Sequence, residues 1–247
     1  MGYRRTPFAP NEWYHCFSRG IDGRTIFETE DDFRRYEELL YLANDTKPVD
    51  RAAIRTLSHE EVFSLPRKAS LVSIGARCLM NNHPHLLLKE EVEGGISSFM
   101  QKVGTGYTMY FNIKRERIGN LLVGPFRSKH ITDDHYLRRV VQYIHLNPAE
   151  IFEPGWKKGI VRNMKILEKK LRDYKHSSLP DYLGEFRPQR AILDEEAIDF
   201  LSTDLPSFGE VLQDTRAYYE ELAGEYGTRN QRRKKSEASP LIFRDTD

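Results

Sequence analysis

Two histidines spaced one residue apart, His83 and His85, open the apolar segment HPHLLLK. In a β-strand, residues i and i+2 point to the same face, so a strand here would project both imidazoles together, as two ligands of one metal ion require. A bare pair of this kind is more commonly two unrelated surface histidines, and a bound divalent ion needs a third protein ligand. The pair therefore indicates a metal site only if another segment completes it.

A second candidate lies in the segment YIHLNP, which runs from Tyr143 to Pro148. Residues i and i+4 are neighbours on one helix face, so Tyr143 and Asn147 would lie one above the other near a helix end. The amide oxygen of Asn147 could bind a hard cation, and the Tyr143 phenol could attack a phosphate that a metal ion polarises. The plainer interpretation is a core tyrosine and a helix-ending Asn-Pro pair. Tyr136 is the competing nucleophile, but it lacks such a partner four residues later.

The composition excludes several classes of protein. The 247 residues include 38 Lys and Arg, 37 Asp and Glu, and 39% hydrophobic residues, which is typical of a soluble globular protein. No run of 18 apolar residues could cross a membrane, and the first residues lack the apolar core of a secretory signal peptide. The two cysteines, Cys16 and Cys78, cannot form a disulfide framework, so we expect a cytoplasmic protein.

The net charge of +1 conceals an uneven distribution. Residues 101–190 contain 18 basic and 9 acidic side chains, whereas residues 191–247 contain 7 basic and 13 acidic ones. Concentrated positive charge favours a polyanionic partner such as nucleic acid, although a solvated surface is the commoner reason for any single charged run.

Hydrophobic periodicity predicts the elements that would position these residues. The predicted strands are Trp13–Arg19, Ala69–Leu79, Pro84–Lys89 and Phe126–Ile131, and the predicted long helices are Glu30–Leu42, Ile96–Lys114 and a helix capped by Thr132 that ends before Pro148. A short helix is expected near Ser58–Phe63, where Ser58 and Glu61 would form a capping box. This pattern predicts an α+β fold, with helices packed on a small sheet in which two neighbouring strands pair antiparallel.

The rest of the chain differs in character. After Asn147 the sequence becomes basic and loop-like, and acidic helical segments are expected at Asp194–Leu201 and Ser207–Glu225. We therefore predict a catalytic domain at residues 1–190 and an acidic helical C-terminal extension with a basic, flexible tail at residues 191–247.

Taken in order, several segments resemble those of the REP-associated tyrosine transposases, which are single-tyrosine members of the HUH nuclease superfamily. The resemblance spans roughly residues 8–184. The segments that carry it are YHCFSRG from Tyr14, MNNHPHLLLK from Met80, YTMYFN from Tyr107, GPFRSK from Gly124, DHYL from Asp134, YIHLNP from Tyr143 and YKHSSLPDYL from Tyr174. Each segment alone is weak evidence for the resemblance, whereas the whole set in this order is hard to obtain by chance.

The resemblance implies a central antiparallel sheet of the ferredoxin-like HUH type, with the histidines on a middle strand and the tyrosine helix beside it. It implies that His83 and His85 bind a divalent ion, Mg²⁺ or Mn²⁺, with Asn147 as third ligand and Tyr143 as nucleophile. The implied activity is cleavage and rejoining of single-stranded DNA near hairpins through a covalent 5′-phosphotyrosine. Single-stranded or hairpin DNA is then the partner, with no membrane and no nucleotide cofactor, and the protein would act as a monomer or a homodimer.

Basic residues near these segments are candidates for DNA contacts. Arg19 and Arg24 flank the first predicted turn, and Arg127 and Lys129 alternate on a strand, so the latter two would share a face. His130 is added because it follows Lys129. Side chains of this kind would bind DNA phosphates and would not distinguish one base sequence from another.

Two rival functions stay open. One is a nucleic-acid-binding protein that keeps the fold but performs no chemistry, and the other is a replication-initiator or relaxase-type nuclease of the same superfamily. The four intact residues His83, His85, Tyr143 and Asn147 favour the enzyme over the binding protein. The single tyrosine and the flanking segments argue against the relaxase type.

Overall fold

The computed structural model describes residues 7–47, 54, 56–158, 160–202, 218 and 220. Its sheet contains strands β1 (Trp13–Phe17), β2 (Val72–Met80), β3 (His83–Glu90) and β4 (Arg127–His130). The strands pair antiparallel in the order β2-β3-β1-β4. With α1 between β1 and β2 and α4 between β3 and β4, the order of elements is the βαββαβ arrangement of ferredoxin-like folds. The predicted α+β class, with the histidines on a middle strand, is confirmed.

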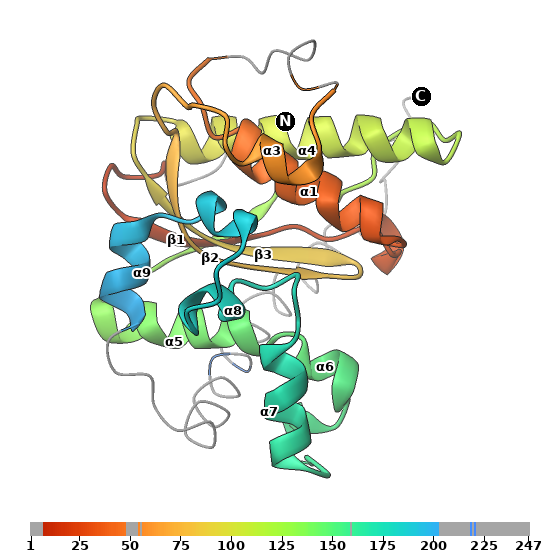
Figure 1. Cartoon of the computed structure of the whole chain (residues 1–247), viewed down its shortest axis with the longest axis vertical. Coiled ribbons are helices and arrows are strands. Elements are labelled where there is room, and N and C mark those ends of the chain that lie inside the picture. Colours follow the sequence, from red (N-terminus) through yellow and green to blue (C-terminus); the bar gives the residue numbers. More distant parts are fainter. Residues whose placement is uncertain are drawn as a thin grey trace, which may run out of the picture.

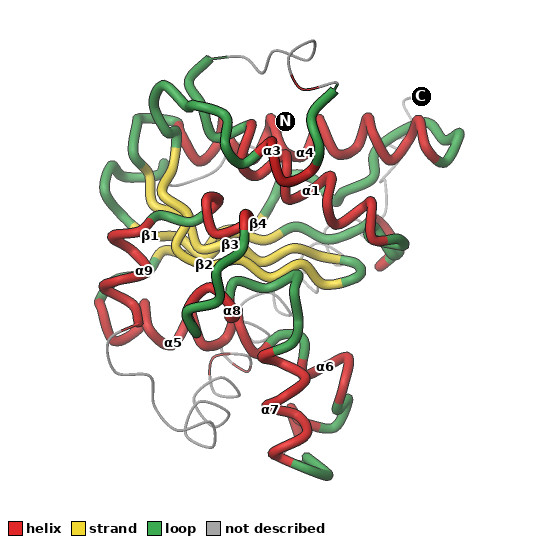
Figure 2. Tube along the Cα trace, viewed as in Figure 1, coloured by secondary structure: helices red, strands yellow, loops and turns green. Residues whose placement is uncertain are grey.

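Helices cover both faces of this sheet (Figure 1, Figure 2). Helices α1 (Glu30–Leu42) and α4 (Gly95–Lys114) lie on one side, and α5 (Asp134–Leu146) lies on the other. The remaining helices are α3 (His59–Val62), α6 (Ala149–Phe152), α7 (Met164–Arg172), α8 (Leu179–Tyr182) and α9 (Glu195–Ser202), with 3₁₀ turns at Ile21–Gly23, Trp156–Lys158 and Pro188–Ile192. None of the helices described has the length and apolar character that a membrane span needs.

Capping residues set the helix starts. Helix α1 begins at the predicted residue because the Asp32 carboxylate accepts the backbone N–H of Thr29, at 2.9 Å. The predicted Ser58–Glu61 capping box is also present. The predicted cap of α5 is wrong by one residue, since Asp133 rather than Thr132 accepts the backbone N–H of Tyr136. A carboxylate there also interacts favourably with the helix dipole.

A tight hairpin joins β2 and β3 through Asn81 and Asn82. Pro84 pairs with Leu79 in this hairpin, but the backbone N–H of Leu79 donates outward to the His176 carbonyl. The nitrogen of Pro84 therefore also faces away from β2, and it lies beyond the last residue of β3 that pairs with β1, His85. Proline thus costs no ladder hydrogen bond here, and the two histidines keep regular strand geometry.

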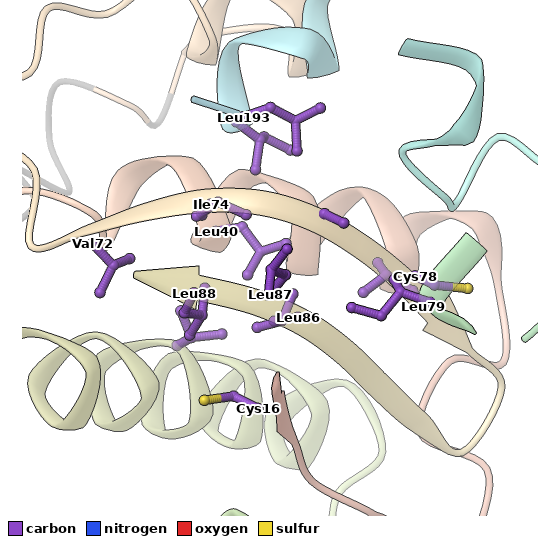
Figure 3. Packing of buried hydrophobic residues seen from close by; sticks show 14 of the residues in the cluster. Cys16, Leu40, Val72, Ile74, Cys78, Leu79, Leu86, Leu87, Leu88 and Leu193 are labelled. Carbon is purple, nitrogen blue, oxygen red and sulfur yellow. The ribbon is translucent and has the colours of Figure 1, made fainter. Parts of the chain in front are cut away.

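The main core lies on both faces of β2 and β3. Figure 3 shows Val72, Ile74, Leu86, Leu87 and Leu88 packed between strands and helices, and each is almost fully buried. Every residue of β2 is buried, because α8 and the segment before it cover its outer edge, where the N–H of Ser178 bonds the Arg77 carbonyl. Coverage on both faces explains why β3 has three consecutive buried leucines, Leu86, Leu87 and Leu88.

The region after Asn147 is helical where the sequence predicted loops, and that prediction is wrong. Helices α6 and α7 project from the α5 side of the sheet and share a small separate core of Leu146, Ala149, Trp156, Leu167 and Leu171 (Figure 1). The predicted helix at Asp194–Leu201 is found as α9.

Helix α9 packs beside β2, where Leu193, Ile198 and Leu201 join the main core. The predicted segment Ser207–Glu225 lies outside the described residues except for Tyr218 and Glu220. The domain boundary at residue 190 stays a prediction.

A buried ion pair ties α1 to the sheet. The Arg77 guanidinium, fully buried on β2, lies 2.8 Å from a carboxylate oxygen of Glu37. Burial alone raises the pKa of Glu37, but Arg77 and the neighbouring His176 and His59 bring it below its usual value. The carboxylate is therefore ionised inside the protein and depends on its partners.

We expect Arg77→Met to lower the free energy of unfolding by about 3 kcal/mol, because it leaves the buried Glu37 charge without its closest partner. Urea denaturation followed by circular dichroism measures this change. The double variant Arg77→Met/Glu37→Leu should recover part of the loss, since it removes the charge as well. An unchanged urea midpoint in the single variant would show that the ion pair does not hold α1 in place.

Candidate active site

Six of the residues predicted to act on DNA line one pocket of about 590 Å³. They are His83 and His85 on β3, Tyr143 on α5, Asn147 directly after α5, Arg127 on β4 and Arg19 after β1. The pocket forms because α5 covers the sheet face on which the middle strand carries its histidines. Segments far apart in the sequence therefore meet at one place.

The two histidines lie as the strand alternation predicted. Their ring centroids are 4.7 Å apart, and His85 is also stacked with His15 of β1 at 5.1 Å. His83 is half-buried and His85 is buried. The expectation that both imidazoles project from one face is confirmed.

Hydrogen bonds determine which ring nitrogens could bind a metal ion. His83 Nδ1 contacts the amide oxygen of Asn82, whose amide nitrogen donates to the Gly23 carbonyl. An amide oxygen only accepts, so His83 carries its proton on Nδ1 and keeps a lone pair on Nε2. In His85, Nδ1 lies 2.9 Å from His15 Nε2, and Nε2 is buried with no hydrogen-bond partner in the described part of the chain. These two Nε2 atoms fit the role of metal ligands.

The imidazoles are held in the form that binds metals. Burial, reinforced by Arg19, lowers the pKa of His83 to about 4. Burial and the neighbouring His83 and His15 lower the pKa of His85 well below its ordinary value. Both rings are therefore neutral at physiological pH, as a metal ligand has to be.

Tyr143 and Asn147 lie beside the histidines. The Tyr143 ring packs edge-on to His85 with centroids 5.5 Å apart. The side-chain amide N–H of Asn147 donates to the Tyr143 carbonyl at 2.8 Å, which leaves the amide oxygen as the atom that could bind a cation. No group of three or more His, Cys, Asp or Glu side chains suited to a metal ion occurs among the residues described. Asn147 lines the same pocket as the two histidines, so its amide oxygen could serve as a third ligand.

Three predicted DNA contacts lie outside the described lining of this pocket. Lys129 shares a face with Arg127, as predicted, and pairs with His15 across the strands. His130 points to the opposite face, where its ring packs on Tyr14 and its Nε2 lies 2.9 Å from a Glu12 carboxylate oxygen. Arg24 lies 3.7 Å from Asp22 in the turn after β1. The structure thus brings Arg19 and Arg127 to the pocket but not the other three.

Sequence reasoning missed four residues here. Glu150 and Lys157 line the pocket and form an ion pair at 2.7 Å, and the spacing of Glu150 three residues after Asn147 could have indicated it. His15 contacts His85, and its place in the apolar strand WYHCF suggested only a structural role. Tyr218 contacts His15 and belongs to the predicted helical segment Ser207–Glu225, but no local pattern indicated that this contact would form.

A comparison with solved structures gives a weak likeness. No protein-family model and no curated protein matches the chain. The chain is similar to a solved structure described as a REP-associated tyrosine transposase bound to a REP hairpin, with a TM-score of 0.48 and 15% sequence identity over 84% of this chain and 100% of that chain. The chemistry of the pocket therefore has to be argued from this chain's own residues.

The lowered pKa values predict how Mn²⁺ binding depends on pH. The pKa of His83 is about 4 and that of His85 lies well below its ordinary value, so both rings stay neutral and the affinity should change little between about pH 7.5 and about pH 5.5. An exposed pair with ordinary pKa values near ~6.5 would instead lose roughly 100-fold over that range. Titration followed by electron paramagnetic resonance of free Mn²⁺ measures the affinity.

His59→Gln is the matched control for this profile, because His59 lies outside the pocket and should not alter it. A steep fall in affinity just below about pH 7 would contradict the buried, neutral state of the pair.

Proposed function

We propose that this chain is a metal-dependent nuclease and strand transferase that cuts single-stranded DNA near hairpins and uses Tyr143 as its nucleophile. The observation that carries the proposal is the convergence of Tyr143, His83, His85 and Asn147 on one pocket. The preference for hairpins rests on the resemblance of the ordered sequence segments to REP-associated tyrosine transposases.

Three side chains would hold the cofactor. The Nε2 atoms of His83 and His85 and the amide oxygen of Asn147 offer two imidazoles and one neutral oxygen. When bound, a divalent ion supplies Lewis-acid polarisation of the scissile phosphate. The protein's part is to keep the imidazoles neutral by burial.

Tyr143 would perform the covalent step. Its phenolic oxygen attacks the phosphorus and forms the 5′-phosphotyrosine bond while the bond to the 3′ oxygen breaks. The phenol loses its proton and the departing oxygen gains one, which leaves a free 3′-OH. Because the energy of the broken bond is kept in the phosphotyrosine, a 3′-OH can reverse the step and rejoin the strand without ATP. Cleavage and rejoining of this kind is the chemistry of transposition.

Positive side chains at the pocket would bind the DNA backbone. Arg19, Arg127 and Lys157 line the same pocket as the tyrosine. Their charges would hold the phosphates next to the scissile bond without reading the bases. Such contacts fit the basic character of residues 101–190.

Tyr143→Phe should abolish the covalent protein–DNA adduct that the native protein forms with single-stranded hairpin DNA and Mn²⁺, because phenylalanine has no attacking oxygen. A denaturing gel detects the adduct, and a gel-shift assay checks that DNA binding is retained. Tyr136→Phe is the matched control on the same helix and should still form the adduct.

An adduct that survives in Tyr143→Phe and disappears in Tyr136→Phe would identify the other tyrosine as the nucleophile. Binding of the hairpin without any adduct in the native protein would favour the non-catalytic DNA-binding protein.

Excess EDTA should abolish cleavage, and added Mn²⁺ should restore it at least as well as Mg²⁺. Two imidazoles and an amide form a softer ligand set than Mg²⁺ prefers. Initial cleavage rates over a titration of each ion measure the effect. Full cleavage in excess EDTA would remove the metal from the mechanism.

A further inference from the structure

A line of hydrogen bonds connects the candidate metal ligand His85 to the C-terminal segment. His85 Nδ1 lies 2.9 Å from His15 Nε2, and His15 Nδ1 lies 2.9 Å from the Tyr218 hydroxyl oxygen. His15 and Tyr218 are fully buried, and His85 is 4% exposed. Three residues distant in sequence thus meet in one chain of buried polar contacts.

We propose that His15 and Tyr218 are positioning residues that set the tautomer of His85 so that its Nε2 atom can bind the divalent ion. The inference rests on the proposed function, since it gives His15 and Tyr218 a role in the metal site named there. Neither residue touches the DNA or the ion in this scheme, and both act through His85.

Proton counting leaves two arrangements for neutral rings. In the first, His85 Nδ1–H donates to His15 Nε2 and His15 Nδ1–H donates to the Tyr218 oxygen, so His85 keeps a lone pair on Nε2. In the second, the Tyr218 hydroxyl donates to His15 and His15 donates to His85, so His85 carries its proton on Nε2. Only the first arrangement leaves His85 able to bind a metal ion.

The surroundings of His85 favour the first arrangement. Its Nε2 atom is buried and has no hydrogen-bond partner among the described residues. In the second arrangement this atom would be a buried N–H without an acceptor, which is costlier than an unused lone pair. The Tyr218 oxygen makes the first arrangement possible because it can accept the His15 proton.

Tyr218 also packs against the candidate nucleophile. Its ring centroid lies 4.7 Å from that of Tyr143, at an interplanar angle of 69°. Tyr218→Phe keeps this ring and removes only the hydroxyl acceptor. The substitution therefore separates the hydrogen-bond role from the packing role.

The test measures Mn²⁺ affinity of the full chain by electron paramagnetic resonance, without DNA, together with the His85 tautomer by ¹⁵N NMR of the metal-free protein. Tyr218→Phe and His15→Met should each weaken Mn²⁺ binding roughly tenfold or more, the range typical for loss of a partner behind a metal-binding histidine. His15→Gln should recover most of the affinity, because its amide oxygen can accept the His85 Nδ1 proton. Tyr136→Phe, whose ring also packs on Tyr218, is the control and should bind Mn²⁺ as the native protein does.

The NMR measurement requires no variant, so it tests the proposal even if a substitution impairs folding. The positioning role would be overturned if His85 of the native protein is protonated on Nε2, or if Tyr218→Phe and His15→Met both bind Mn²⁺ as tightly as the native protein. Either result would leave the proposed nuclease intact. Failure of the native protein to bind Mn²⁺ would overturn both this role and the metal mechanism.

Discussion

The alternation of side chains along β3 is the constraint on which the rest of the structure depends. Because His83 and His85 point to the α5 face, Leu86 and Leu88 must point to the face that α1 and α4 cover, where they join the core. The histidines and these two leucines therefore occupy opposite faces of one strand. A slip of one residue in register would exchange them, so the packing that stabilises the sheet also holds the histidines in the pocket.

Charge and burial act together in this pocket. Arg19 and Lys157, which line it, contribute to the lowered pKa of His83, after the larger effect of burial. The same positive charges suit a phosphate backbone. The same arrangement of cations around a buried strand would thus suit both the proposed polyanionic substrate and the proposed metal site, which needs neutral imidazoles. The net charge of +1 does not reveal this, because acidic residues elsewhere in the chain balance the basic region.

Local relationships could be predicted because they depend only on backbone periodicity. The shared face of His83 and His85 follows from the two-residue repeat of a strand, and the contact between Tyr143 and Asn147 follows from the helical repeat. The bounds of α1 could be read from its capping residues and apolar spacing. Helices α6 and α7 were not predicted, because α6 is a single turn, α7 is short and basic, and both gain their stability from a small core around Trp156. The acidic composition after residue 190 likewise gave no indication that Leu193 and Ile198 are buried in the main core.

The sequence by itself determined the strands of the sheet, helices α1, α4, α5 and α9, the α+β class and the two residue pairs with the right chemistry. Only the tertiary structure decided that both pairs face one pocket and that His15 and Tyr218 lie behind His85. The physical reason is the distance along the chain between the residues that interact. Hydrogen-bond geometry along one strand or helix repeats every few residues, whereas the contact of Tyr218 with His15 spans 203 positions and exists only once Tyr218 has packed against the sheet.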